Sequence, residues 1–115
     1  MKIKLPDNIK KTIKNQDIEE YILEDNGKEI KGWTLFNSFT EFRFFNNDIE
    51  IGFYIDNDDF SELVGAFYIS NERIMTTKVY TYQSKAGLKI AYKDCIKELL
   101  EKYKNFVKGF YEEKN

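Results

Sequence analysis

The feature that most constrains this fold is a change in hydrophobic period near residue 87. From Leu88 onward, apolar residues recur at steps of three and four, at positions 91, 92, 95, 96, 99, 100, 103, 106, 107 and 110. Steps of three and four place side chains on one wide stripe of an α-helix. We therefore expect a long helix over roughly residues 87–112, whose apolar face must be buried against another element.

The segment before this helix has the period of β-strands. Four apolar residues alternate strictly with four other residues: Ile49, Ile51, Phe53 and Ile55 with Glu50, Gly52, Tyr54 and Asp56. This alternation predicts a half-buried strand with one face in water. A partner strand is expected over residues 39–45, joined by a turn at 46–48, and two further strands are expected over residues 62–70 and 73–83.

Two local signals lie nearer the start of the chain. Asn26-Gly27 favours a type I′ hairpin turn, with the following strand running on through Trp33. This pairing would set Leu23 opposite Ile30 and Glu20 opposite Trp33. Asp7 follows the only proline and is a candidate cap for a short helix that would end near residue 13.

Together these elements predict a single α+β domain over residues 1–115. Its antiparallel sheet would have about six strands in a meander, with a short N-terminal helix and one long C-terminal helix packed across the sheet. A second arrangement fits the same pattern, in which a strongly curled sheet or half-barrel wraps around the long helix.

The composition excludes several kinds of chemistry. The chain has no histidine and a single cysteine, Cys95, so it has neither the usual catalytic triads nor a Cys/His zinc site. The standard phosphate-binding loops are also missing, and we expect no cofactor and no enzymatic activity. Cys95 falls on the apolar stripe of the helix, which favours a buried core thiol.

Location and source are indicated by composition as well. No secretory signal and no apolar run long enough to cross a membrane are visible. With one cysteine and no internal disulfide, these observations predict a cytoplasmic protein. Its richness in Lys, Asn, Ile, Phe and Tyr, whose codons are AT-rich, is typical of a low-GC bacterium, a phage or a mobile element.

Charge is divided unevenly along the chain. Residues 44–72 carry seven acids and no base, whereas residues 73–115 carry ten bases and five acids. The central acids, with two aromatic residues among them, form the candidate partner-binding surface: Asp48, Glu50, Tyr54, Asp56, Asp58, Asp59, Phe60 and Glu62. Such a surface would attract a basic protein, although a plain solvated face has the same composition.

Other interpretations of the charged residues are weaker. The segment 56–67 departs from a calcium-binding loop at three positions, so no metal site is expected. Asp59 and Glu62 instead fit the capping box of a short helical turn. Lysines spaced four apart along the last helix are interrupted by acids, which indicates an ordinary outer face and no direct binding to nucleic acid.

Three hypotheses for function remain. The first is an immunity protein that neutralises a basic, nuclease-like toxin through its acidic surface. The second is a phage or mobile-element inhibitor of a host defence nuclease, acting through the same surface. The third is a small-ligand-binding domain or histidine-free enzyme, with an aromatic pocket lined by Trp33, Tyr80, Tyr82 and Tyr92. The oligomeric state is not predicted.

Overall fold

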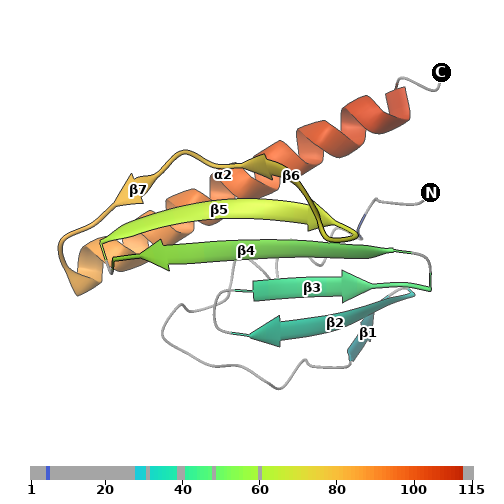
Figure 1. The fold of residues 1–115 in the computed structure, drawn as a ribbon, viewed down its shortest axis with the longest axis horizontal. Helices are drawn as coiled ribbons and strands as arrows, with labels where there is room; N and C mark the ends of the chain where they lie inside the picture. Colours follow the sequence, from blue (N-terminus) through green and yellow to red (C-terminus); the bar gives the residue numbers. More distant parts are fainter. Residues whose placement is uncertain are drawn as a thin grey trace.

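The computed structural model describes residues 5, 28–30, 32–38, 41–47, 49–59 and 61–112. They form an antiparallel sheet with one long helix, α2, lying along one face (Figure 1). The strands are β1 (Lys28–Ile30), β2 (Trp33–Ser38), β3 (Glu41–Phe45), β4 (Glu50–Asp58), β5 (Glu62–Ile69), β6 (Glu72–Thr76) and β7 (Tyr80–Thr81), and α2 spans Lys85–Glu112. The predicted α+β class, meander and terminal helix are confirmed.

The strands pair in chain order from β1 to β6, so the described sheet is an open meander and not a closed barrel. β7 pairs with β5 beyond the end of β6, because β6 and β7 follow the same edge of β5 one after the other. The expected single strand over residues 73–83 is therefore interrupted at residues 77–79. An interrupted edge strand offers a shorter template for unwanted pairing with other chains.

Local turn chemistry sets the hairpins. Ser70 and Asn71 both have positive φ, at 49° and 70°, which is the signature of the type I′ turn that joins β5 to β6. At the β3–β4 turn, the Asn46 side chain accepts a hydrogen bond from the Ile49 amide at 3.0 Å. Asparagine favours such turns because its side chain mimics a backbone acceptor.

Alternation places one face of the sheet in the core. The largest fully buried side chains of the sheet come from every second position of β2 to β5: Leu35, Phe42, Phe44, Ile51, Phe53, Leu63 and Phe67. Tyr103 of α2 packs edge-on against Phe53 and Phe67, with ring centroids 5.2 and 5.6 Å away. Its hydroxyl accepts a hydrogen bond from the Leu5 amide at 3.0 Å, which ties a residue near the start of the chain to the last helix.

The predicted helical stripe is the face of α2 that packs on the sheet. Ala91, Tyr92, Cys95, Ile96 and the stripe residues that follow at 99, 100, 103 and 107 are buried. The helix begins two residues before the predicted start, because Ser84 caps it: its hydroxyl accepts a hydrogen bond from the Gly87 amide at 3.0 Å. Among the described residues, no helix has the length and apolarity of a membrane span.

Two local predictions were wrong. Trp33 does not continue the strand that contains Ile30; the chain turns at Gly32, whose φ is 89°, and Ile30 and Trp33 pair across the turn. Asp59 does not begin a helical turn either. It adopts a positive φ of 51° in the hairpin between β4 and β5, and Glu62 pairs with Asp58 as the first residue of β5.

Two further predictions, the short helix at residues 7–13 and the Asn26-Gly27 turn, lie outside the described residues.

Candidate protein-binding face

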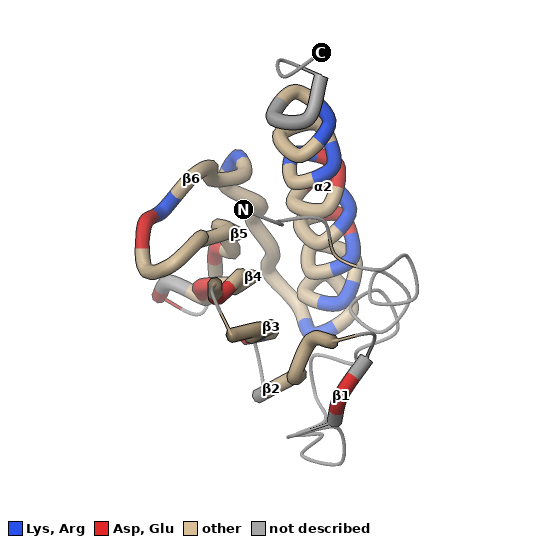
Figure 2. Tube along the Cα trace, turned by 90° about the vertical axis from the view of Figure 1, so that its right-hand side faces the viewer, with Lys and Arg blue, Asp and Glu red and all other residues tan. Residues whose placement is uncertain are grey.

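The face of the sheet opposite α2 is the candidate site, and we call it the outer face. It is formed by the strand residues that alternate with the core, on β2 to β5: Thr34, Phe36, Glu41, Arg43, Phe45, Glu50, Gly52, Tyr54, Asp56, Glu62, Val64, Ala66 and Tyr68. Figure 2 shows the sheet and α2 as two separate layers, with α2 on one side only. No described element covers the outer face.

The structure places several predicted site residues on this face. On β4, Glu50, Tyr54 and Asp56 point outward while Ile49, Ile51, Phe53 and Ile55 are buried, so the predicted alternation is confirmed. Glu62 lies on the outer face of β5, and Asp59 is exposed in the turn between the two strands. Asp58 belongs to β4, but its side chain is not described, and Asp48 and Phe60 lie outside the described residues.

The carboxylates do not form one compact cluster. Glu50 and Asp56 lie six residues apart on β4, which corresponds to roughly 20 Å along an extended strand. Glu50 is also paired with a cation from the neighbouring strand: Arg43 Nε lies 2.8 Å from Glu50 Oε1 and 3.4 Å from Glu41 Oε1. The hydrogen bond to Glu50 raises the pKa of Arg43. The negative charge without an internal partner is therefore at the Asp56 and Glu62 end.

Aromatic rings connect the outer-face residues of β2 to β5. Phe36 and Phe45 meet edge to face with centroids 5.4 Å apart, and the Arg43 guanidinium lies 4.9 Å from the Phe45 centroid. Tyr54 and Tyr68 form a second edge-to-face pair at 5.0 Å. Phe36 is 44% exposed, and aromatic residues, Phe among them, are enriched in protein interfaces relative to the rest of the surface.

Gly52 makes the position of Tyr54 possible. A Cβ at residue 52 would lie 2.7 Å from a ring carbon of Tyr54, so the ring folds back over bare backbone. Burial, together with the charge and hydrogen bond of Glu41, raises the pKa of Tyr54 to about 12. The tyrosine therefore stays neutral and fixed by Glu41, which gives this part of the face a defined shape.

Sequence reasoning missed five of these residues: Phe36, Glu41, Arg43, Phe45 and Tyr68. On β3, Phe42 and Phe44 lie in the core, whereas Phe45 points to the outer face and contacts Phe36 of β2. Arg43 lies just outside the acidic stretch of the sequence, and the β3–β4 register brings it beside Glu50. The turn was predicted at residues 46–48, whereas Phe45 pairs with Glu50, so the loop is one residue longer and the register differs from the predicted one.

Basic residues gather on the other layer. The exposed lysines at positions 85, 89, 93, 97, 104 and 108 all belong to α2, and Figure 2 shows them in blue along the helix. The molecule thus has a helix layer rich in lysine and a sheet layer whose outer face has more acids than bases. This arrangement agrees with an ordinary outer face for the lysines.

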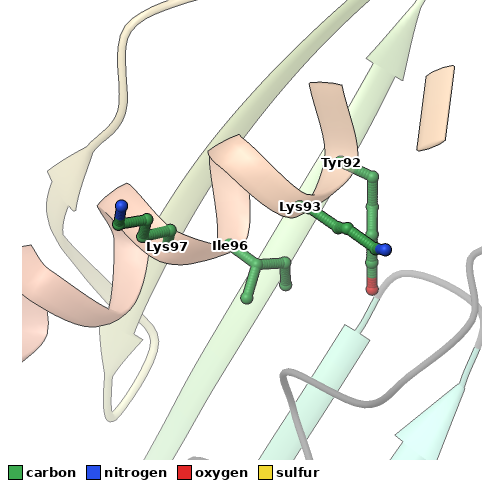
Figure 3. Close-up of a pocket in the computed structure, with 4 residues that line it drawn as sticks. All are labelled: Tyr92, Lys93, Ile96 and Lys97. Atoms are coloured by element: carbon green, nitrogen blue, oxygen red, sulfur yellow. The ribbon is translucent and has the colours of Figure 1, made fainter. Parts of the chain in front are cut away.

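Two of the aromatic residues proposed for a ligand pocket line separate hollows in the described part of the chain. Tyr92 lines a hollow of about 270 Å³ with Lys93, Ile96 and Lys97, drawn in Figure 3. Tyr80 lines a different, shallower hollow of about 540 Å³ between β7 and α2, and Trp33 is buried in the core. The small-ligand or histidine-free-enzyme hypothesis therefore stays a prediction from the sequence.

The remaining reactive groups have structural roles. Cys95 is buried in the core, and burial raises the pKa of its thiol to about 11, so the thiol stays protonated at neutral pH. Within the described part of the chain, no three metal-ligating side chains come together. Glu98 accepts hydrogen bonds from the Tyr80 hydroxyl at 2.6 Å and the Lys78 amide at 3.1 Å, which fastens β7 to α2.

Comparisons of this chain with protein-family models, with curated proteins and with solved structures gave no match. We therefore infer its function from the chemistry of its surface.

Proposed function

We propose that this chain is a non-enzymatic protein inhibitor, an immunity protein that binds a basic, nuclease-like toxin through the outer face of its sheet. The observation that carries the proposal is the combination of exposed or half-buried rings and carboxylates on a face that no described element covers. Tyr54, Tyr68 and Phe36 would supply the desolvated anchors, and Asp56 and Glu62 would attract the partner.

The distribution of charge supports a basic protein as the partner. Arg43 is already neutralised by Glu41 and Glu50, whereas Asp56, Asp59 and Glu62 are exposed and make no ion pair with any described residue. Complementary charge at the rim of an interface mainly accelerates association. A fast-binding inhibitor suits a toxin that must be blocked soon after synthesis.

The first test asks whether the protein neutralises a toxin. Each neighbouring reading frame would be expressed from an inducible promoter in a sensitive host, with and without this protein. We expect one frame to arrest growth and co-expression of this protein to restore it. If no toxic frame is rescued, the immunity role is wrong. Rescue from a host defence nuclease during phage infection would instead support the second hypothesis, which uses the same surface.

The second test asks whether the outer face is used. The triple variant Asp56→Lys, Asp59→Lys, Glu62→Lys should slow association with the rescued toxin by about tenfold or more, with the largest effect at low salt. Glu50 is left unchanged because its reversal would also break the pair with Arg43. The matched control reverses three exposed acids elsewhere, Glu72, Asp94 and Glu101. Equal association rates for both variants would exclude the outer face.

A further inference from the structure

We infer that the outer face takes an arginine side chain from its partner, seated over Ala66 between the Tyr54–Tyr68 pair and Asp56. This inference rests on the proposed function and specifies the partner's chemistry. It commits to a guanidinium group from a protein, and a lysine ammonium or a second copy of this chain is a competing outcome of the experiment below.

The first observation is that this face already holds a guanidinium group of its own. Arg43 is clamped between Glu50, with Nε 2.8 Å from Oε1, and the Phe45 ring, 4.9 Å from the guanidinium carbon. A carboxylate at the side and an aromatic ring below form a recurrent arrangement for arginine recognition. The internal pair therefore shows which chemistry this surface accommodates.

The second observation is that β4 and β5 repeat these components and contain no lysine or arginine of their own. Tyr54 pairs with Ala66 across β4 and β5, and Asp56 pairs with Val64, one step along the same face. Cross-strand neighbours on one face lie about 5 Å apart and diagonal neighbours about 7–8 Å apart. A group placed over Ala66 therefore lies between the Asp56 carboxylate on one side and, on the other, the Tyr54–Tyr68 ring pair, whose Tyr54 ring extends over Gly52.

The size of Ala66 leaves room for such a group. Its side chain is a single methyl, whereas the outward-facing residues before and after it along β5 are Val64 and Tyr68. The Tyr54 and Tyr68 rings meet at 80°, so one ring can offer its face while the other offers its edge. On the side away from β4, Thr76 of β6 lies opposite Ala66, and Arg73 lies opposite Tyr68.

Arginine fits this site better than lysine. A guanidinium is planar and weakly hydrated, so it stacks on a ring and bonds a carboxylate at the same time, whereas an ammonium keeps its water. Asp56 is exposed and makes no ion pair with any described residue. A partner arginine would therefore meet a carboxylate that no described cation occupies.

The experiment titrates the full-length protein, labelled with ¹⁵N, with capped hexa-arginine and hexa-lysine peptides at low salt. We expect the arginine peptide to bind at least several-fold more tightly and to shift the amides of residues 54–56 and 64–68 most. Equal affinity for the two peptides, or shifts spread over all acidic residues, would overturn the arginine site while leaving a basic partner possible. The arginine site would also be overturned if the protein bound neither peptide and its spectra changed on dilution, which would show that a second copy of this chain occupies the face.

A substitution tests the position directly. Ala66→Arg should fill the site with an internal guanidinium, as Arg43 fills its own, and should abolish the preference for the arginine peptide. The matched control Thr34→Arg adds the same charge to the outer face on β2 and should retain the preference. If both variants lose it equally, charge alone explains binding and the site is wrong. Failure of toxin rescue with an intact arginine preference would overturn the proposed function and leave the site.

Discussion

Gly65 of β5 lies against Cys95 of α2. A Cβ added at this residue would meet Cys95 Sγ at 3.1 Å, Ile55 Cδ1 at 3.1 Å and Thr77 Cγ2 at 3.2 Å. All three atoms belong to buried residues, so none has space to move away. The amide of the same glycine donates to the Thr77 hydroxyl at 2.9 Å, which holds the edge segment against β5.

We predict that Gly65→Ala destabilises the protein by about 1–3 kcal/mol, because an extra methyl overpacks a filled core. Gly109→Ala is the matched control: a Cβ there meets nothing within 4 Å, and removing a glycine from a helix stabilises it by about 0.5–1 kcal/mol. Urea unfolding of both variants gives the two free energies. An unchanged free energy of unfolding for Gly65→Ala would show that β5 and α2 can move apart at little cost.

Residue by residue, burial in β4 and α2 follows closely from the spacing of apolar residues. Asp59 and Glu62 show where such reasoning fails: their spacing matches a capping box, yet the β4–β5 register places them in a hairpin. Pairing between Asp58 and Glu62 depends on two complete strands, and a four-residue window contains no information about it. The Arg43–Glu50 ion pair was missed because it depends on the register of β3 with β4.

At the scale of elements, the edge strand is held by side chains from the helix. At residues 77–79, between β6 and β7, the regular pairing with β5 is interrupted. Glu98 of α2 accepts hydrogen bonds there from the Lys78 amide and from the Tyr80 hydroxyl. The Lys78 ammonium lies 5.0 Å from the Tyr80 ring centroid and adds a cation–π contact. One helical carboxylate thereby joins the two layers at this edge.

We predict that Glu98→Gln loosens the β6–β7 edge and costs about 1–2 kcal/mol, because hydrogen bonds to a charged acceptor are stronger than those to a neutral one. Amide hydrogen exchange at residues 77–80 should accelerate, while exchange in β3 and β4 should not. Glu101→Gln removes an exposed charge from the same helix and should leave exchange unchanged. Equal exchange in both variants would show that the carboxylate does not hold the edge.

At the scale of the whole molecule, three acidic groups hold their protons more tightly in the folded state. Burial raises the pKa of Cys95 to about 11 and, with Glu41, that of Tyr54 to about 12. Burial and the Glu98 carboxylate also raise the pKa of Tyr80. As the pH rises, the unfolded chain therefore loses these protons first, and folding stability must fall.

We predict that these groups do not reduce the free energy of unfolding below pH 9.0, the ordinary pKa of a cysteine thiol. Above pH 9.0 the free energy of unfolding should fall progressively as the pH rises through about 11 and 12, the pKa values of Cys95 and Tyr54 in the folded protein. Urea midpoints measured from pH 7 upward would trace the loss. Cys95→Ala removes the first group to titrate and should flatten the curve between pH 9 and 11. If the urea midpoint of that variant falls as steeply with pH as that of the parent, the thiol has the same pKa in the folded and unfolded states.

The order of the elements along the chain has a consequence for biosynthesis. Every described strand is translated before the 28 residues of α2, so a growing polypeptide exposes the Phe53 and Phe67 side of its sheet until the helix that covers it has been made. At about 5–20 residues per second, the ribosome needs roughly 1–6 seconds to add those residues. We therefore expect the nascent chain to bind chaperones during that interval and to reach its native state only after α2 has been translated.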